Sequence, residues 1–121
     1  MLSREDILNA DDLPVREVET PEWGEGASVF VRTLSAAERE AMTDFNKGDD
    51  GKEKGNFLGR FVAVVACDDK GLRLFEDGDA EALAEKGPDA LIRIMEAAQE
   101  HNGMTESAAE AVEKNSEPSQ D

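Results

Sequence analysis

The sequence predicts a single small α+β domain over residues 1–103, mainly helical, with a short β-hairpin or small sheet near its N-terminal part, followed by a flexible acidic tail over residues 104–121. Three observations predict this class. A strand-like stretch at residues 27–34 carries valines on one side and a phenylalanine on the other. Apolar residues recur at helical spacing in residues 57–65 and 91–98. Beyond the domain, large apolar residues become scarce, which favours disorder.

The first predicted element is a short helix or turn over residues 3–13, ended by Pro14. Ser3 suits an N-cap, because its hydroxyl can accept a hydrogen bond from an amide of the first turn. The acidic Glu5 and Asp6 then lie where the helix dipole is positive. The apolar residues of this segment are Ile7, Leu8 and Leu13.

Residues 15–34 predict a β-hairpin. The first half alternates too irregularly for a central strand, and Pro21, which cannot donate to a sheet ladder, favours a strand end or an edge position. Gly24 and Gly26 supply the turn geometry, and the lone tryptophan, Trp23, is expected beside this turn. The second half is expected to place Val29 and Val31 on one face and Phe30 on the other.

Two helices separated by a loop are predicted in the middle of the chain. Ser35 and Glu38 form a capping box, S-x-x-E, at the start of a helix that ends near Asn46. A loop rich in Gly, Asp and Lys follows to residue 55. The last four of residues 56–71, DDKG, predict a turn. The apolar run before them fits either a helix or a buried strand, since the spacing of Phe57, Phe61 and Val65 favours a helix and the β-branched valines favour a strand. We expect the helix.

The last elements are a short strand at residues 72–75, a short helix and a longer helix. Asp77 or Asp79 caps the short helix, and Gly87 ends it at the C′ position. Pro88 suits the first turn of the longer helix, which Asn102-Gly103 ends. Its apolar stripe, expected to be core with a partner groove as the alternative, is Leu91, Ile94, Met95 and Ala98.

The composition argues against several classes of function. Twenty-nine acidic residues against 13 basic ones give a net charge of −16, which repels nucleic acid and anionic membranes. No apolar stretch approaches the roughly 18 residues that a membrane span needs. The single cysteine, Cys67, excludes an internal disulfide framework and is expected to be a small buried apolar residue. With no secretory signal at the N-terminus, this usage fits a reducing cytosol.

No pattern indicates catalysis, a metal or a cofactor. The one histidine, His101, is expected in the last turn of a helix, where it favours the dipole, and the sequence specifies no nucleophile beside it. Acidic segments starting at Asn46, Asp68 and Asp77 each fail the calcium-loop pattern at required positions. No phosphate-binding loop is present. We therefore expect a binding or structural protein rather than an enzyme.

Several segments in a fixed order carry a family resemblance. They are LSREDILNADDLPVREVETPEWG, VFVRTLSAAERE, the apolar helix leading into DDKGLRLF, and DALIRIMEAAQEHNGMT ahead of VEKNS. In this order they resemble the tail assembly chaperones of long, non-contractile-tailed bacteriophages, the lambda-type family. The similarity covers nearly the whole chain, and the loop at residues 47–55 departs from it.

The resemblance implies a chaperone that coats the tape-measure protein, keeps it soluble and assists the tail tube protein as it polymerises around it. It also implies a location in the host cytoplasm, a longer form made by ribosomal frameshifting, and absence from the mature virion. Self-association is left open, and no nucleic acid, membrane, cofactor or metal is expected as a partner. The residues expected to contact partner proteins are Trp23, Phe30, Leu91, Ile94 and Met95.

Two alternatives stay open. Trp23 is either a client contact or, the interpretation that the thin core favours, a cap on that core with its indole N–H bonded to a carbonyl. The protein itself is either a chaperone or an acidic decoy that mimics DNA and occupies a basic nucleic-acid-binding protein. The net charge permits the decoy, but the carboxylates lack a long regular run.

Overall fold

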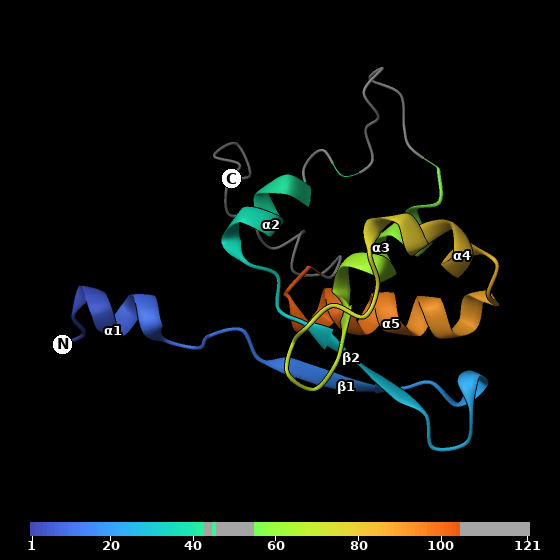
Figure 1. Cartoon of the computed structure of the whole chain (residues 1–121), viewed down its shortest axis with the longest axis horizontal. Helices are drawn as coiled ribbons and strands as arrows, with labels where there is room; N and C mark the ends of the chain where they lie inside the picture. Colours follow the sequence, from blue (N-terminus) through green and yellow to red (C-terminus); the bar gives the residue numbers. More distant parts are fainter. Residues whose placement is uncertain (43–44, 46–54, 105–121) are drawn as a thin grey trace, which may run out of the picture.

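Five α-helices and a three-stranded antiparallel sheet form the part of the chain that the structure describes (Figure 1). The computed structural model describes residues 1–42, 45 and 55–104. This architecture confirms the predicted α+β class. The elements are α1 (Arg4–Asn9), β1 (Val15–Glu19), the 3₁₀ turn η1 (Pro21–Trp23), β2 (Ser28–Arg32), α2 (Ala36–Ala41), α3 (Phe57–Val65), β3 (Ala66–Cys67), the 3₁₀ turn η3 (Asp77–Asp79), α4 (Ala80–Ala84) and α5 (Pro88–His101).

Two predicted segments cannot be compared with this structure. Most of the predicted loop at residues 46–55 lies outside the described residues. The same is true of the predicted tail at residues 104–121, except for Met104.

The sheet is built around β2, which pairs with β1 on one side and β3 on the other. Val18 lies opposite Val29, and Val31 lies opposite Ala66. Opposed residues share a face of an antiparallel sheet, so these four form one apolar face, which packs into the same core as α5. Phe30 lies on the other face, as predicted, and β1 is an edge strand, as Pro21 indicated.

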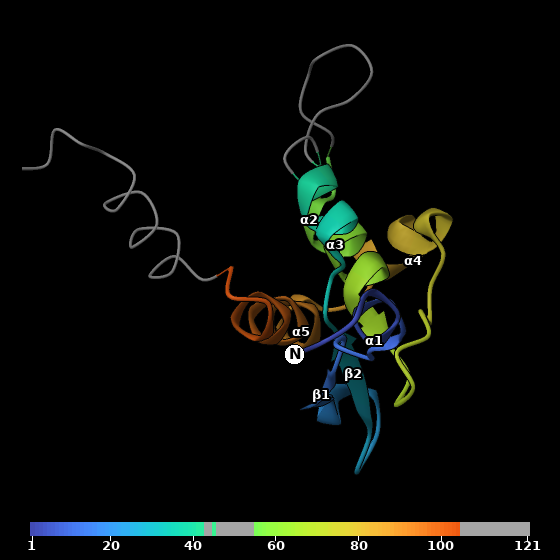
Figure 2. The ribbon, with the colours of Figure 1, turned by 90° about the vertical axis from the view of Figure 1, so that its left-hand side faces the viewer.

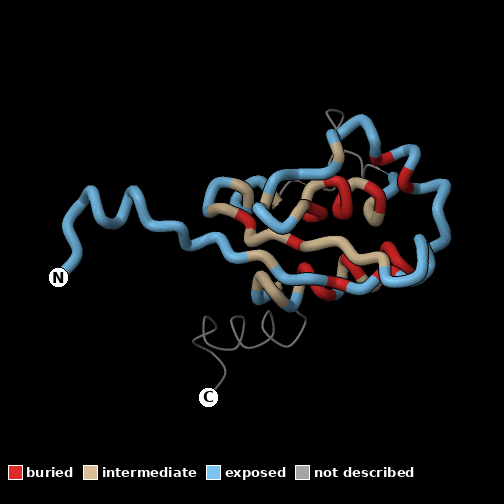
Figure 3. The backbone as a smooth tube through the Cα atoms, turned by 60° about the horizontal axis from the view of Figure 1, so that its bottom comes forward, coloured by how far each residue is buried: buried red, intermediate tan, exposed pale blue. Residues whose placement is uncertain are grey.

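The two longest helices, α3 and α5, supply much of the core. The helix expected in residues 56–71 is confirmed for Phe57–Val65, where Phe61, Val62 and Val65 are fully buried. The stripe on α5 is also confirmed as core, since Leu91 is 2% exposed and Ile94 is 0% exposed. Figure 3 shows the buried residues gathered in the body of the protein, with none in the N-terminal segment.

The strand predicted at residues 72–75 is wrong. In the described residues this segment makes a single β-bridge, between Arg73 and Cys67, and its two leucines are exposed. The third strand of the sheet is instead β3, directly after α3, in residues that the prediction gave to the helix. Residues 66 and 67 are fully buried beside β2, and pairing with this strand overrides the local helical pattern.

The helix starts are mostly as predicted. Ser35 and Glu38 form the expected capping box of α2, and Pro88 occupies the first turn of α5. Gly87 differs from its predicted role: with φ of −60° and ψ of 148° it is extended, and it serves as the N-cap of α5 rather than the end of α4. A single glycine between two helices can serve either helix, so sequence position alone did not decide between them.

A close contact joins α3 to α4. A Cβ atom added at Gly59 would lie 2.5 Å from the backbone oxygen of Ala80, so only glycine fits there. Asn56, in the left-handed conformation with φ of 59°, caps α3 by accepting from the Gly59 amide at 3.1 Å. Its Nδ2 donates to the Ala80 oxygen at 2.8 Å. The two helices are therefore held together by the Asn56 side chain, and they approach closely because Gly59 has no side chain.

Gly59→Ala is expected to lower the free energy of unfolding by about 1–3 kcal/mol, because the added methyl overpacks the contact with α4. Gly78→Ala is the matched control, since a Cβ there meets no atom within 4 Å. Urea unfolding of both variants measures the difference. Equal stability of the two variants would contradict the close contact.

Candidate functional site

The hairpin corner, residues 20–27, is a compact turn. Its backbone is closed by hydrogen bonds from the amide of Trp23 to the oxygen of Thr20 at 3.0 Å and from Ala27 to Gly24 at 3.0 Å. Gly24 and Gly26 have φ of 145° and 75°, which only glycine adopts without strain. The predicted turn glycines are therefore confirmed.

Trp23 lies beside this turn, as predicted, and is 37% exposed. It is not among the residues that pack into the core, and within the described residues no hydrogen bond from its indole nitrogen is found. Its side chain instead lines a surface pocket of about 460 Å³ with residues of the α4–α5 connection. The core-capping interpretation of Trp23 therefore gains no support from its position, and the indole is accessible to a partner.

A bidentate ion pair fixes the hairpin corner on α5. The Glu22 carboxylate accepts from both terminal nitrogens of Arg93, at 2.7 and 2.6 Å. The same guanidinium donates to the Glu19 backbone oxygen at 3.2 Å, at the end of β1. These hydrogen bonds from Arg93 lower the pKa of Glu22 to about 2.

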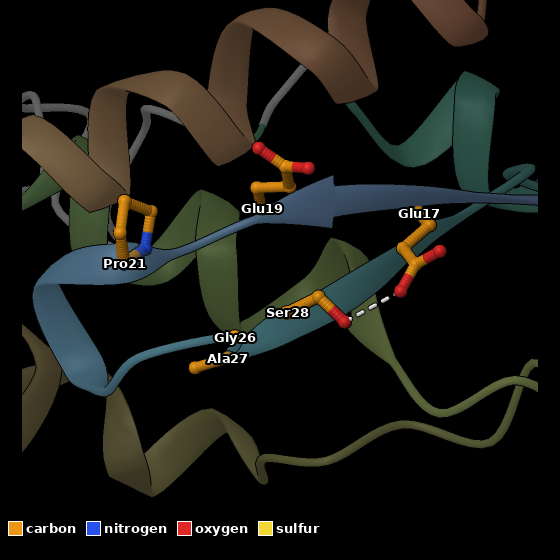
Figure 4. Close-up of a pocket in the computed structure, with 6 residues that line it drawn as sticks. All are labelled: Glu17, Glu19, Pro21, Gly26, Ala27 and Ser28. Carbon is orange, nitrogen blue, oxygen red and sulfur yellow. Dashed lines mark hydrogen bonds between the residues drawn. The ribbon is translucent and has the colours of Figure 1, made fainter.

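A second pocket, of about 360 Å³, lies where β1 and β2 meet the corner (Figure 4). Two carboxylates line it, and Figure 4 shows that of Glu17 turned toward Ser28, whose hydroxyl donates to it at 2.7 Å. The lining is negative and would suit a basic side chain of a partner. In the described residues no group of three or more His, Cys, Asp or Glu could hold a metal ion.

The predicted contact residues do not form one surface. Phe30 is half-buried on the other face of the sheet from Val29. Met95 is half-buried against the core. Leu91 and Ile94 are buried, so a partner could reach their side chains only if α5 left the core. Of the five, Trp23 is the most accessible.

Cys67 and His101, the two reactive side chains discussed from the sequence, both take part in contacts that hold the fold together. Cys67 is fully buried in β3, and this burial raises the pKa of its thiol. His101 is the last residue of α5, as expected, with Nε2 at 2.8 Å from the Thr33 hydroxyl and 3.0 Å from the Pro14 oxygen. Both residues join segments that are far apart in the sequence.

The N-terminal arm, residues 1–14, extends away from the body (Figures 1 and 3). Every one of its residues is exposed. The helix expected there is confirmed as α1, with Ser3 and Asp6 forming a reciprocal capping box. Its exposed large apolar residues are Met1, Leu2, Ile7, Leu8 and Leu13. The sequence contains one sign of this arm, a short capped helix with Ile7 and Leu8 followed by Pro14, but no sign that its apolar residues would stay exposed.

The base of the arm is fastened to the body. The Thr33 hydroxyl donates to the Pro14 oxygen at 2.6 Å, and the His101 ring lies against both groups. Figure 2 shows the arm and the end of α5 from the side on which the arm leaves the body. These contacts fix the point at which the arm leaves the body.

Asn102 fixes this region further. Its Oδ1 accepts from the Leu34 amide at 2.8 Å, and its Nδ2 donates to the oxygens of Arg32 at 3.1 Å and Ala98 at 2.8 Å. Its own backbone oxygen accepts from the Arg39 guanidinium at 2.8 Å. One residue thus links the end of α5 to the end of β2, to the β2–α2 connection and to α2.

Comparison with known proteins gives no identification, because no family model, no curated protein and no solved structure matches this chain. In the described residues no helix is both long enough and apolar enough to cross a membrane.

Asn102→Ala is expected to lower the free energy of unfolding by about 1–3 kcal/mol, because it leaves the Leu34 amide without its partner in a partly buried site. Asn9→Ala, at the exposed end of α1, is the matched control and is expected to have little effect. Chemical unfolding measures both. A loss no larger than that of the control would show that Asn102 does not fasten α5.

The Glu22–Arg93 pair predicts a pH dependence of stability. Because the folded-state pKa of Glu22, about 2, lies below its usual value of 4.5, the pair stabilises the fold fully above about pH 4.5. This stabilisation is lost as the pH falls from there toward 2.

The variant Glu22→Gln removes this titration. The measurement is the unfolding midpoint of the wild-type chain and of this variant as a function of pH. The difference in unfolding midpoint between the wild-type chain and the variant is expected to be largest at neutral pH and to shrink below pH 4.5. Glu25→Gln, which removes the same charge from the same corner, controls for net charge. A difference independent of pH would contradict the assignment.

Proposed function

We propose that this protein is a tail assembly chaperone of the kind made by long, non-contractile-tailed bacteriophages. It binds the tape-measure protein in the host cytoplasm, keeps it soluble, and assists the tail tube protein as it polymerises around this client. It is not part of the mature virion. The observation that carries the proposal is the exposure of large apolar side chains on a chain with a net charge of −16.

Physical chemistry supports this role. A long apolar client aggregates because its exposed surface is driven out of water. A small protein that covers this surface with a few apolar side chains, and adds negative charge to each complex, opposes aggregation through mutual repulsion. Trp23 offers one apolar contact, and the carboxylates around the hairpin corner provide charge beside it. The ordered segments that resemble the family give the second line of support.

This role needs no chemical step. Binding is reversible, and displacement by tube protein can release the client, so the proposal requires no catalytic residue, nucleotide or metal. The protein acts as a binding partner rather than an enzyme.

The net charge also favours a second candidate, an acidic decoy that occupies a basic nucleic-acid-binding protein. Such a decoy binds through charge alone, so its affinity falls steeply with salt. Exposed apolar side chains would contribute little to it. Binding that survives moderate salt therefore separates the chaperone from the decoy.

Co-expression with the tape-measure protein from the same source tests the function. We expect the client to be insoluble alone, and to become soluble and to co-purify in the presence of the chain at 0.3–0.5 M salt, roughly where exposed charge pairs are screened. Trp23→Ala is expected to unfold cooperatively but to recover less client, because the indole is accessible. If neither this chain nor its frameshifted longer form solubilises the client, the chaperone assignment fails.

A further inference from the structure

The helix α1 has a complete N-terminal cap, but all of its residues are exposed and none packs against the body. Its capping box is complete, with the Asp6 amide donating to the Ser3 hydroxyl at 3.1 Å and the Ser3 amide donating to the Asp6 carboxylate at 3.0 Å. Leu2 and Ile7 occupy the two positions of a hydrophobic staple around this cap. Six residues are too few to be stable alone, since isolated helices shorter than about 12–15 residues are marginal in water.

The apolar side chains of the arm are unusually open to water. Leu8 is 65% exposed, and its neighbour Ile7 is exposed as well. Adjacent residues lie about 100° apart around a helix, so Ile7 and Leu8 form one exposed apolar edge of α1, which docking into an apolar groove can bury. The arm is fastened at Pro14 by Thr33 and His101, and residues 1–14 are all exposed, so the arm extends from the body rather than folding onto it (Figure 1).

The charge of the arm indicates the chemistry of its partner. Four carboxylates accompany one guanidinium, that of Arg4, which lies 3.6 Å from the Glu5 carboxylate. A partner surface that receives the apolar residues therefore needs basic side chains at its rim. A second copy of this chain is disfavoured, because each copy carries a net charge of −16.

From these observations we propose that the N-terminal arm is a docking segment, which inserts Ile7 and Leu8 into an apolar, helical surface bordered by Lys or Arg. The inference rests on the proposed function for the identity of that surface, which belongs to the tape-measure protein. Docking completes the packing of α1, and the acidic residues of the arm pair with the basic border.

The test uses the full chain co-expressed with the tape-measure protein. The double variant Ile7→Ser/Leu8→Ser removes the apolar contact, and Leu72→Ser is the matched control, because Leu72 is also 65% exposed but lies on the body. We expect the amount of client that co-purifies per chain to fall at least tenfold for the double variant and to stay within twofold for the control. Both variants are expected to keep the wild-type unfolding midpoint, since neither site is buried.

One further double variant and one measurement separate the alternatives. Asp11→Asn/Asp12→Asn, which keeps the apolar residues, is expected to weaken client binding mainly at low salt. Sedimentation of the chain alone, over a range of concentrations, reports whether the arm binds a second copy.

The outcomes are distinct. If the wild-type chain does not bind the client, the proposed function fails and this inference fails with it. If the wild-type chain and the double variant bind equally, the function stands and the arm is not the docking segment. If the double variant abolishes self-association of the chain alone while client binding is unchanged, the occupant is a second copy, and the inference is overturned.

Discussion

The side-chain amide of Asn102 is the constraint on which the arrangement of this protein depends most. It satisfies two backbone groups at the β2–α2 connection, 68 and 70 residues earlier in the chain, and one in its own helix. Because these groups are partly buried, leaving any of them without a partner is costly, so these hydrogen bonds favour the observed docking of α5 beside β2. The adjacent His101 and Thr33 then hold Pro14, which sets where the arm leaves the body.

The protein consequently has two parts with different physical roles. The body has a core of α3, α5 and the sheet, and the contact of Gly59 with Ala80 ties α4 to it. The arm has a formed cap and exposed apolar residues but no packing of its own. In the proposed role, the body would hold this incompletely packed, acidic segment in place, and an apolar client would supply the packing that α1 lacks.

Local signals allowed much of the fold to be predicted, and the rest depends on contacts between distant residues. The capping box at Ser35, the proline at the start of α5 and the spacing of the phenylalanines in α3 act within one or two turns of helix, and each prediction was confirmed. β3 was missed because its two residues become a strand only beside β2. The exposure of the arm was missed because a periodic pattern does not say whether a second surface exists to cover it.

Hydrogen exchange of the full chain, alone and with the tape-measure protein, tests the central claim most directly, which is that the body is fixed while α1 stays open until a client covers it. The account predicts slow exchange for amides of α3 and α5 in the free chain, fast exchange for residues 4–9, and protection of residues 4–9 when the client is bound. Protection of residues 4–9 in the free monomer equal to that of α5 would show that the arm already packs on the body, and would contradict the account.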